Sequence, residues 1–296
     1  MTSPSVTTPP VFRFAPSPNG ELHLGHALSA LAAYDAAQKA RGRFLLRIED
    51  IDVTRCREEY VEQIFEDLRW LGLAWEMPLL RQSQHFDVYA KAASWLENIG
   101  LLYPCFATRT EIAEAAARQP SGFDPDGAPL YPGLHKKMAG AEAWARRQRS
   151  EPFALRLDMD RALAAAAGLL NGAALTFTEF DEAGEGTIVA ARPERWVDAI
   201  IVRKDVPASY HLAVTIDDAR QGVTHVTRGM DLFAATDLHR LLQVLLGLPE
   251  PKYRHHRLIT DAEGRKLAKS AHDTSIRSLR EAGLSPSDIR ALVQRI

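Results

Sequence analysis

Two pairs of basic side chains, one near each end of the chain, have the types and the spacing to bind a nucleoside triphosphate. His23 and His26 stand in the segment His-Leu-Gly-His, and Lys266 and Lys269 stand in Lys-Leu-Ala-Lys-Ser. Residues three apart on a helix share one face, and the first helical turn offers unpaired N–H groups to phosphate. Two ammonium groups on a loop can neutralise the charge of a departing pyrophosphate. Either pair alone is typical of an ordinary surface, but both together favour one ATP site closed from two sides.

The two segments resemble the HIGH and KMSKS signatures of class I aminoacyl-tRNA synthetases. Leu24 replaces the middle Ile of the first signature, and Leu267 and Ala268 replace Met and Ser of the second. From about Val11 to about Ser270 the chain is similar to the glutamyl branch of this family. The similar stretches are RFAPS at 13–17, LRIEDID at 46–52, LGLAW at 71–75, YHLAV at 210–214, GVTHV at 222–226 and RGMDL at 228–232. The resemblance implies an α/β fold, a Rossmann-like catalytic domain with a parallel sheet, and the use of ATP and Mg²⁺.

The hydrophobic pattern independently predicts alternating strands and helices. Apolar runs predict strands at 11–14 and 43–48, and apolar positions with helical period predict helices at 25–39 and 60–71. This alternation indicates a parallel sheet with right-handed crossovers, in which ligands bind beyond the carboxyl ends of the strands. After Trp196 we expect the sheet to resume with strands at 199–203 and 210–216, followed by an amphipathic helix at 232–246.

A change of composition in the middle of the chain suggests that an insertion divides the catalytic fold. We expect a disordered tail at 1–10, the two halves of the nucleotide-binding fold at 11–104 and 194–256, and an insertion at 105–193. By resemblance, this insertion is of the acceptor-binding type. Residues 257–296 would hold the KMSKS-like loop and a short helical segment. Full-length glutamyl enzymes continue with a large anticodon-binding domain, which we do not expect in this chain.

A pocket selective for glutamate needs guanidinium groups for two carboxylates and an acid for the ammonium group. The resemblance implies that L-glutamate is bound by Arg13, Phe14, Ala15, Pro16, Ser17, Glu49, Tyr210 and Arg228. In this arrangement Glu49 faces the amino group, Tyr210 adds a hydroxyl and Arg228 pairs with a carboxylate. The acids at 49, 50 and 52 also fit a structural cap after the strand or a magnesium site. For ATP, the resemblance implies binding by His23, Gly25, His26 and Lys269.

The chemistry requires positioning more than acid or base catalysis, because a carboxylate can attack the α-phosphorus of ATP directly. His23, His26, Lys266 and Lys269 would then be catalytic by stabilising the growing charge, with Mg²⁺ on the phosphates.

Few residues follow Ser270, so the chain resembles the shortened paralogues that transfer glutamate to queuosine in the anticodon loop of tRNA(Asp). The alternatives are a minimal enzyme that charges a tRNA 3′ end and a catalytically silent RNA-binding paralogue. A nucleotidyltransferase that makes a metabolite adenylate is a more remote alternative.

The composition is that of a globular protein without a targeting or membrane segment. The net charge of −2 argues against tight, unspecific nucleic-acid binding, although local basic patches can contact RNA. Such patches stand at 136–137, 146–149 and 254–257, where solvated helix faces are the alternative for the first two. No apolar run reaches the length of a membrane helix, and two cysteines exclude a disulfide scaffold. We therefore expect a cytoplasmic monomer.

A zinc site, which the family often carries in the insertion, is incomplete in this sequence. Cys105 stands where the family has the first ligand, but Ala107 and His135 replace two further cysteines. Together with Tyr131, the donors remain one short of the four that structural zinc requires. We expect no zinc here, with Cys105 packed as a small apolar residue.

Overall fold

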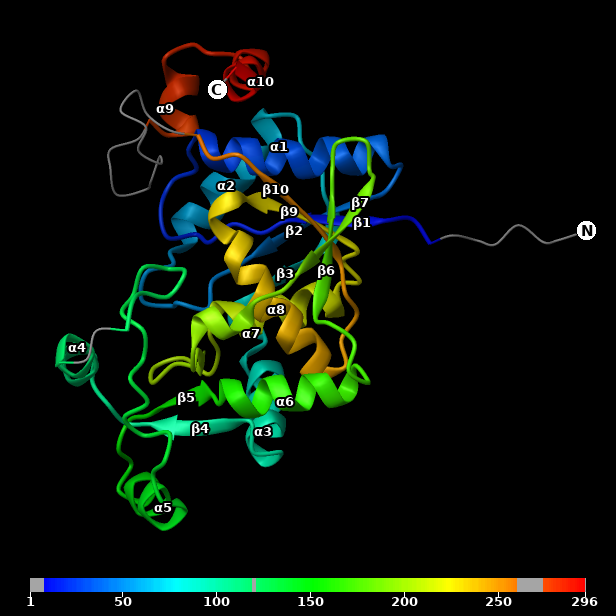
Figure 1. Ribbon diagram of the computed structural model, residues 1–296. Helices are drawn as coiled ribbons and strands as arrows, with labels where there is room; N and C mark the ends of the chain where they lie inside the picture. The colour runs from blue at the N-terminus through cyan, green and yellow to red at the C-terminus, as the bar shows by residue number, and fades with distance from the viewer. Residues whose placement is uncertain (1–7, 119–120, 260–273, 296) are drawn as a thin grey trace, which may run out of the picture.

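A seven-stranded sheet forms the centre of the computed structural model, which describes residues 8–118, 121–259 and 274–295 (Figure 1). The strand order is β3-β2-β1-β9-β10-β6-β7, and all neighbours are parallel except the β6–β7 hairpin. The strands are β1 (Val11–Phe14), β2 (Arg43–Ile48), β3 (Glu76–Arg81), β6 (Thr176–Phe180), β7 (Gly186–Ala190), β9 (His225–Gly229) and β10 (Lys252–His256). The order reverses between β1 and β9, which makes their carboxyl ends the expected place for a ligand.

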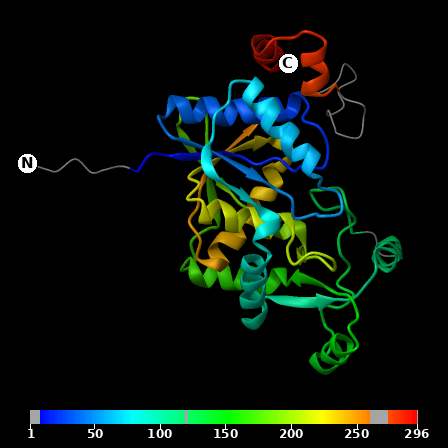
Figure 2. The same ribbon diagram turned by 180° about the vertical axis from the view of Figure 1, so that it is seen from behind.

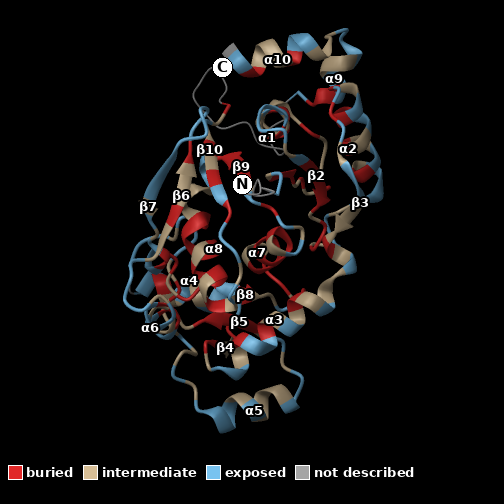
Figure 3. Ribbon diagram, turned by 90° about the vertical axis from the view of Figure 1, so that its right-hand side faces the viewer, coloured by how far each residue is buried: buried red, intermediate tan, exposed pale blue. Residues whose placement is uncertain are grey.

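Helices cover both faces of this sheet. One face carries α1 (Leu24–Lys39), α2 (Glu58–Trp70), α9 (Ile276–Glu281) and α10 (Pro286–Arg295), which share a core with β1 and β2. The other face carries α7 (Tyr210–Arg220) and α8 (Phe233–Leu246), which lie on the opposite side of the sheet from α1 in Figure 1. Figure 3 shows that α7 and α8 are largely buried. Most of their residues are buried, and polar side chains such as Asp218 and His239 are buried along with the apolar ones.

A second, antiparallel sheet of three strands packs beneath α7 and α8. It consists of β4 (Leu102–Cys105), β5 (Ala154–Leu157) and β8 (Ile200–Val202), in that order. Around it lie α3 (Phe86–Asn98) and α6 (Met159–Leu169), while α4 (Arg109–Arg118) and α5 (Gly140–Gln148) project outward, as Figure 2 shows from behind. Short 3-10 turns occur at Gln82–Gln84, Pro193–Trp196 and Met230–Leu232. One apolar core joins this sheet to α3, α6, α7 and α8.

The elements predicted for the first half of the fold are confirmed. The strands at 11–14 and 43–48 have the predicted bounds and are parallel neighbours, and the helices predicted at 25–39 and 60–71 correspond to α1 and α2. The helix predicted at 232–246 corresponds to α8. The α/β class with a mainly parallel sheet is therefore correct.

The strand predicted at 210–216 is wrong, because these residues begin helix α7. Ser209 caps the helix by accepting a hydrogen bond from the backbone N–H of Leu212. The residues from Leu212 to Asp218 are all buried, so the segment lacks the polar face that reveals a helical period. A short apolar run that is buried on all sides cannot be told from a strand by periodicity.

The predicted insertion at 105–193 does not coincide with one sheet. Strand β6 pairs in parallel with β10 through Tyr253 and Glu179, so the β6–β7 hairpin extends the main sheet. Conversely, β8 lies in the small sheet rather than the main one, although the strand itself was predicted at 199–203. The domain division remains a proposal, and sheet membership favours an insertion that ends before β6.

Within the described residues, no helix combines the length and the apolar character that crossing a membrane requires.

Candidate active site

A cavity of about 450 Å³ opens beyond the carboxyl ends of β1 and β9, where the strand order reverses. All the described residues that the sequence suggested for binding glutamate and ATP line this cavity. They are Arg13, Phe14, Ala15, Pro16, Ser17, His23, Gly25, His26, Glu49, Tyr210 and Arg228. Lys266 and Lys269 lie outside the described residues. The structure thus brings the predicted residues together, while their roles remain predictions.

The two imidazoles lie next to each other at the start of α1. His23 is the N-cap residue, and its Nδ1 accepts a hydrogen bond from the backbone N–H of Gly25 at 3.0 Å. The backbone N–H of His23 donates to Nδ1 of His26 at 3.2 Å, and the ring centres are 3.9 Å apart. Because both Nδ1 atoms accept, the proton of each neutral ring is on Nε2. Two N–H donors at a helix N-terminus can stabilise phosphate oxygens.

Gly25 is required by the close approach of the His23 ring. A Cβ atom at this position would lie 2.9 Å from Cε1 of His23, closer than side chains normally approach. Any larger residue would therefore displace the ring that caps the helix. The glycine of the signature is explained by this contact rather than by an unusual backbone angle.

The described residues that flank segment 260–273 lie at this cavity or contact a residue that lines it. Leu258 and Ile259, immediately before the segment, line the cavity. Shortly after the segment, Ser275 forms an antiparallel β-bridge with His23. The next residue, Ile276, donates its backbone N–H to the carbonyl of Leu22 at 2.8 Å. The described residues on either side of the segment that carries the two lysines therefore line the cavity or pair with His23.

A network of charged side chains lies beside the cavity, and two of its members, Arg13 and Glu49, line it. Asp218 on α7 accepts hydrogen bonds from Arg13 Nε at 3.1 Å and from Arg47 Nη1 at 2.7 Å, and Arg47 also donates to Glu49 at 2.9 Å. Burial alone would raise the pKa of Asp218, but the charges of Arg13 and Arg47 outweigh it and hold the pKa below its usual value. For Glu49, burial prevails over Arg47 and Arg13 and raises the pKa. A bound ammonium group would stabilise the ionised form of Glu49.

Three residues of this site were missed in the sequence. Arg47 lies in the LRIEDID stretch, but no role followed from it, and Asp218 was hidden because its helix was predicted to be a strand. Thr227 lines the cavity, is buried, and its Oγ1 has no hydrogen-bond partner within the described part of the chain. A buried hydroxyl without a partner is costly, so a ligand or a water molecule is expected beside it. No sequence pattern signals such an atom.

Residues 10–296 match the family described as tRNA synthetases class I (E and Q), catalytic domain. The Glutamyl-Q tRNA(Asp) synthetase of Rhodobacter capsulatus is 44% identical over 96% of this chain and 99% of its own length. The Glutamate–tRNA ligase 2 of a Ruegeria species is 35% identical over 96% of this chain but only 60% of its own length. The chain belongs to the class I (E and Q) tRNA synthetase family.

Solved structures of this family confirm the fold. A glutamate–tRNA ligase of Elizabethkingia meningosepticum, solved in complex with its amino acid, superposes with a TM-score of 0.69 at 26% identity. The match covers 93% of this chain and 53% of that one, so the chain spans about half the length of the solved relative. Membership of the class I (E and Q) family implies the use of ATP.

The acids next to Glu49 have structural partners. Asp50 accepts hydrogen bonds from the backbone N–H and the hydroxyl of Ser83, each at 2.8 Å, and Asp52 accepts one from Thr54 at 2.6 Å. The Thr54 hydrogen bond is the largest cause that lowers the pKa of Asp52 to about 2. Neither acid lines the cavity, so the predicted capping alternative fits them, whereas Glu49 alone faces the site.

The basic patches that were candidates for RNA contact within the insertion are engaged in ion pairs. Lys136 is close to three carboxylates, those of Asp158, Asp160 and Asp198. The other ion pairs are Arg146 and Arg149 with Glu151, and Arg147 with Glu97. These pairings favour structural roles for Lys136, Arg146, Arg147 and Arg149 over RNA contact, although 136–137 lie in a turn and not on the predicted type of helix face.

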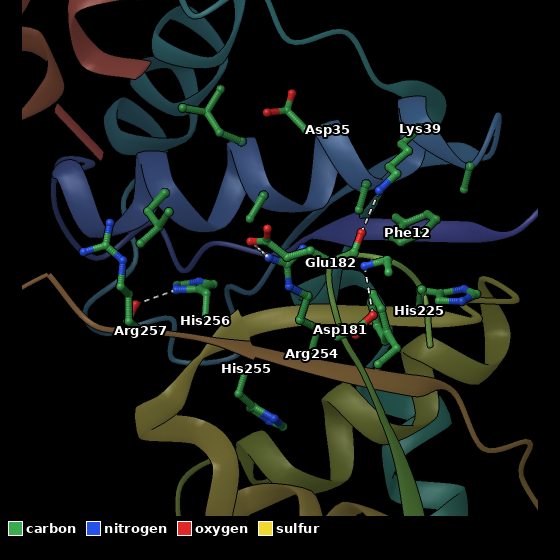
Figure 4. Close-up of a pocket in the computed structure, with 18 of the residues that line it drawn as sticks. Phe12, Asp35, Lys39, Asp181, Glu182, His225, Arg254, His255, His256 and Arg257 are labelled. Atoms are coloured by element: carbon green, nitrogen blue, oxygen red, sulfur yellow. Dashed lines mark hydrogen bonds and ion pairs between the residues drawn. The ribbon is translucent and has the colours of Figure 1, made fainter. Parts of the chain in front are cut away.

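A larger cavity of about 860 Å³ lies along α1 and contains none of the predicted glutamate-binding residues (Figure 4). Lys39 donates to the carbonyl oxygen of Glu182 at 2.7 Å, and Arg254 donates to the carboxylate of Glu182 at 2.5 Å. Also in its lining, Arg290 of α10 pairs with Asp35 of α1 at 2.9 Å. Since the side chains proposed to bind glutamate are not in its lining, size alone does not make this cavity the active site. The smaller cavity, with its converging donors, is the stronger candidate.

Hydrogen bonds occupy the region of the incomplete zinc site. The thiol of Cys105 lies 3.3 Å from the hydroxyl of Tyr131, which accepts from the backbone N–H of His135 at 3.0 Å. Nδ1 of His135 accepts from the backbone N–H groups of Phe106 and Ala107 at 3.2 and 3.3 Å. With Nδ1 of His135 used in this way and no side-chain donor at Ala107, these residues do not fit the tetrahedral set of zinc.

Proposed function

We propose that the protein activates L-glutamate with ATP and transfers the glutamyl group to the queuosine base in the anticodon loop of tRNA(Asp). The observation that carries this proposal is the match to the Rhodobacter Glutamyl-Q tRNA(Asp) synthetase, which extends over 99% of that protein at 44% identity. The Ruegeria Glutamate–tRNA ligase 2 is less similar and is matched over 60% of its length.

The deep end of the cavity has the charge that free glutamate requires. The buried guanidinium groups of Arg13 and Arg228 line the cavity together with the carboxylate of Glu49. The buried ion pair of Arg47 with Asp218 lies next to them and completes the set of three guanidinium groups and two carboxylates. One positive charge is left in excess, and free glutamate carries one net negative charge. Glu49 is proposed to bind the ammonium group, while Arg13 and Arg228 bind carboxylate. Burial raises the pKa of Tyr210, so its hydroxyl stays protonated and can donate.

Activation requires one glutamate carboxylate to meet the α-phosphorus of ATP. A carboxylate oxygen forms a bond to phosphorus while the bond from this phosphorus to the pyrophosphate oxygen breaks. His23 and His26 are proposed to stabilise the phosphate charge through their Nε2–H groups, and Lys266 and Lys269 to neutralise the departing pyrophosphate. When bound, Mg²⁺ would neutralise part of the phosphate charge, and it is typically held mainly by phosphates and water. The described residues contain no group of three acidic, histidine or cysteine side chains that could hold a metal by themselves.

Transfer requires a hydroxyl on the RNA, which attacks the carbonyl carbon of glutamyl-adenylate and releases AMP. The proposed acceptor is a hydroxyl of the cyclopentenediol ring of queuosine. We further propose that the protein acts in the cytoplasm as a monomer and needs no zinc, since the donor set around Cys105 does not fit the metal. Sedimentation at micromolar concentration would test the monomer.

The decisive experiment offers radiolabelled glutamate and ATP with tRNA(Asp) that carries queuosine or lacks it. Label that is retained only on the queuosine-bearing RNA, and within its anticodon stem-loop fragment, would support the proposal. Label on the 3′ end, independent of queuosine, would instead support a minimal charging enzyme. A folded protein without glutamate-dependent exchange between ATP and pyrophosphate would indicate the silent paralogue.

A further inference from the structure

Arg228 donates hydrogen bonds to three side chains, all of which are uncharged acceptors. Its Nε donates to Nε2 of His255 at 3.2 Å, its Nη1 to Nδ1 of His239 at 3.1 Å, and its Nη2 to Oγ1 of Thr236 at 2.6 Å. All four residues are buried. A guanidinium group has five N–H bonds, so two remain, one on each Nη atom. This is the number and arrangement that a carboxylate can accept.

The hydrogen-bond partners fix the protonation of His255. Its Nδ1 lies 2.9 and 3.0 Å from the two carboxylate oxygens of Glu179, so Nδ1 carries the proton and Nε2 accepts. Figure 4 shows that the His255 side chain points to the other face of β10 from His256. Burial lowers the pKa of His255, against the effect of Glu179, and the ring stays neutral near pH 7.

Hydrogen-bond partners also fix the protonation of the second imidazole, that of His239. Since Nδ1 of His239 accepts from Arg228, its proton is on Nε2, which lies 3.1 Å from Nδ1 of His211 and donates to it. Burial, reinforced by the charge of Arg228, lowers the pKa of His239 well below its usual value and that of His211 to about 4. Both rings are therefore neutral at physiological pH.

Arg228 differs in this respect from the other two arginines of the site. Arg13 and Arg47 each form an ion pair with Asp218, whereas no carboxylate of the described residues pairs with Arg228. Glu179, which lies behind His255, is separated from Arg228 by the imidazole ring. A buried charge without a counter-charge is costly, and that cost is relieved when an anion binds.

We infer that His239, His255 and Thr236 are positioning residues that determine specificity, because they hold Arg228 without neutralising it and so reserve its charge for the γ-carboxylate of glutamate. The inference rests on the proposed function. The α-carboxylate must reach the phosphates at the His23 end of the cavity, which directs the amino-acid side chain to the buried arginine end. The carboxamide of glutamine carries no charge to balance Arg228, and its NH₂ group would meet donors. The neutral acceptors thereby make the site reject glutamine.

A matched pair of substitutions tests this inference. In His239→Asn and His239→Asp the side-chain oxygen can take the place of Nδ1, so both variants keep an acceptor for Arg228, but only His239→Asp brings a negative charge. The measurement is kcat/KM for glutamate and for glutamine in the exchange between ATP and pyrophosphate. We expect His239→Asp to reduce the preference for glutamate over glutamine by about 100-fold relative to His239→Asn. A purely structural role would lower the two rates together and leave their ratio unchanged.

Thr236→Asn and Thr236→Asp repeat the comparison at a second acceptor, in case the His239 variants do not fold. An unchanged ratio of the glutamate and glutamine rates in a folded aspartate variant would overturn the inference while leaving the proposed function intact. If the unaltered protein shows no glutamate-dependent exchange, the proposed function fails and this inference fails with it. A loss of preference in the aspartate variants alone would support the inference.

Discussion

His23 and Ser275 form a β-bridge although they come from opposite ends of the chain. The bridge joins the start of α1 to the second residue after segment 260–273. Ile259, which precedes that segment, lines the candidate active-site cavity together with His23. This arrangement supports the proposal that two short signatures, separated by most of the sequence, act on one triphosphate. The His23 ring itself is positioned by its contact with Gly25.

Gly25→Ala should impair catalysis without impairing folding. The added Cβ would lie 2.9 Å from the His23 ring and displace it, while alanine is favourable in a helix. We expect glutamate-dependent exchange to fall by about 10- to 100-fold, as for other small displacements of a positioning group. Gly168→Ala is the control, because a Cβ at Gly168 in α6 meets nothing within 4 Å. Equal exchange rates in the two variants would contradict this account of the signature glycine.

Asp218→Asn should destabilise the protein strongly. The substitution leaves the buried groups of Arg13 and Arg47 without their shared carboxylate, and removing one partner of a buried ion pair costs about 3–5 kcal/mol. Urea unfolding measures the difference. Asp35→Asn, which removes the exposed partner of Arg290, serves as the control and should cost about 1 kcal/mol or less. A mild effect of Asp218→Asn would mean that the arginines find other partners.

Asp67→Asn should stabilise the protein at neutral pH but not in acid. Asp67 on α2 is buried, and burial raises its pKa from 3.8 to about 6. A raised pKa favours the protonated form in the folded state, so stability falls as the pH rises from about 4 to about 6 and the unfolded chain ionises first. We expect the variant to gain about 3 kcal/mol at pH 7.5 and nothing below pH 4. Glu62→Gln, at an exposed position of the same helix, should show no such pH dependence.

Chelators should leave the melting temperature unchanged. The Cys105 region is held by hydrogen bonds among Tyr131, His135 and the backbone, and its donors do not fit zinc. Differential scanning calorimetry with and without a strong zinc chelator measures this, together with metal analysis of the purified protein. One equivalent of zinc, or a fall of many degrees on chelation, would show that the metal is bound after all.

A helix with one buried face and one solvent-exposed face can be predicted from the period of its apolar residues. Helix α2 has a solvent face, so the period of its apolar residues was readable, and β2 was marked by a short apolar run. Helix α7 was mistaken for a strand because tertiary packing covers it on all sides, and this error also concealed Asp218. The neutral imidazoles behind Arg228 come from α8 and β10, and only the fold brings them together.

The most direct test of the central claim is a structure of the protein bound to a non-hydrolysable analogue of glutamyl-adenylate. The account predicts the analogue in the cavity between β1 and β9, with its phosphate beside His23 and His26 and its glutamyl carboxylate against Arg13 and Arg228. An analogue bound instead in the larger cavity along α1, beside Lys39 and Glu182, would contradict the account.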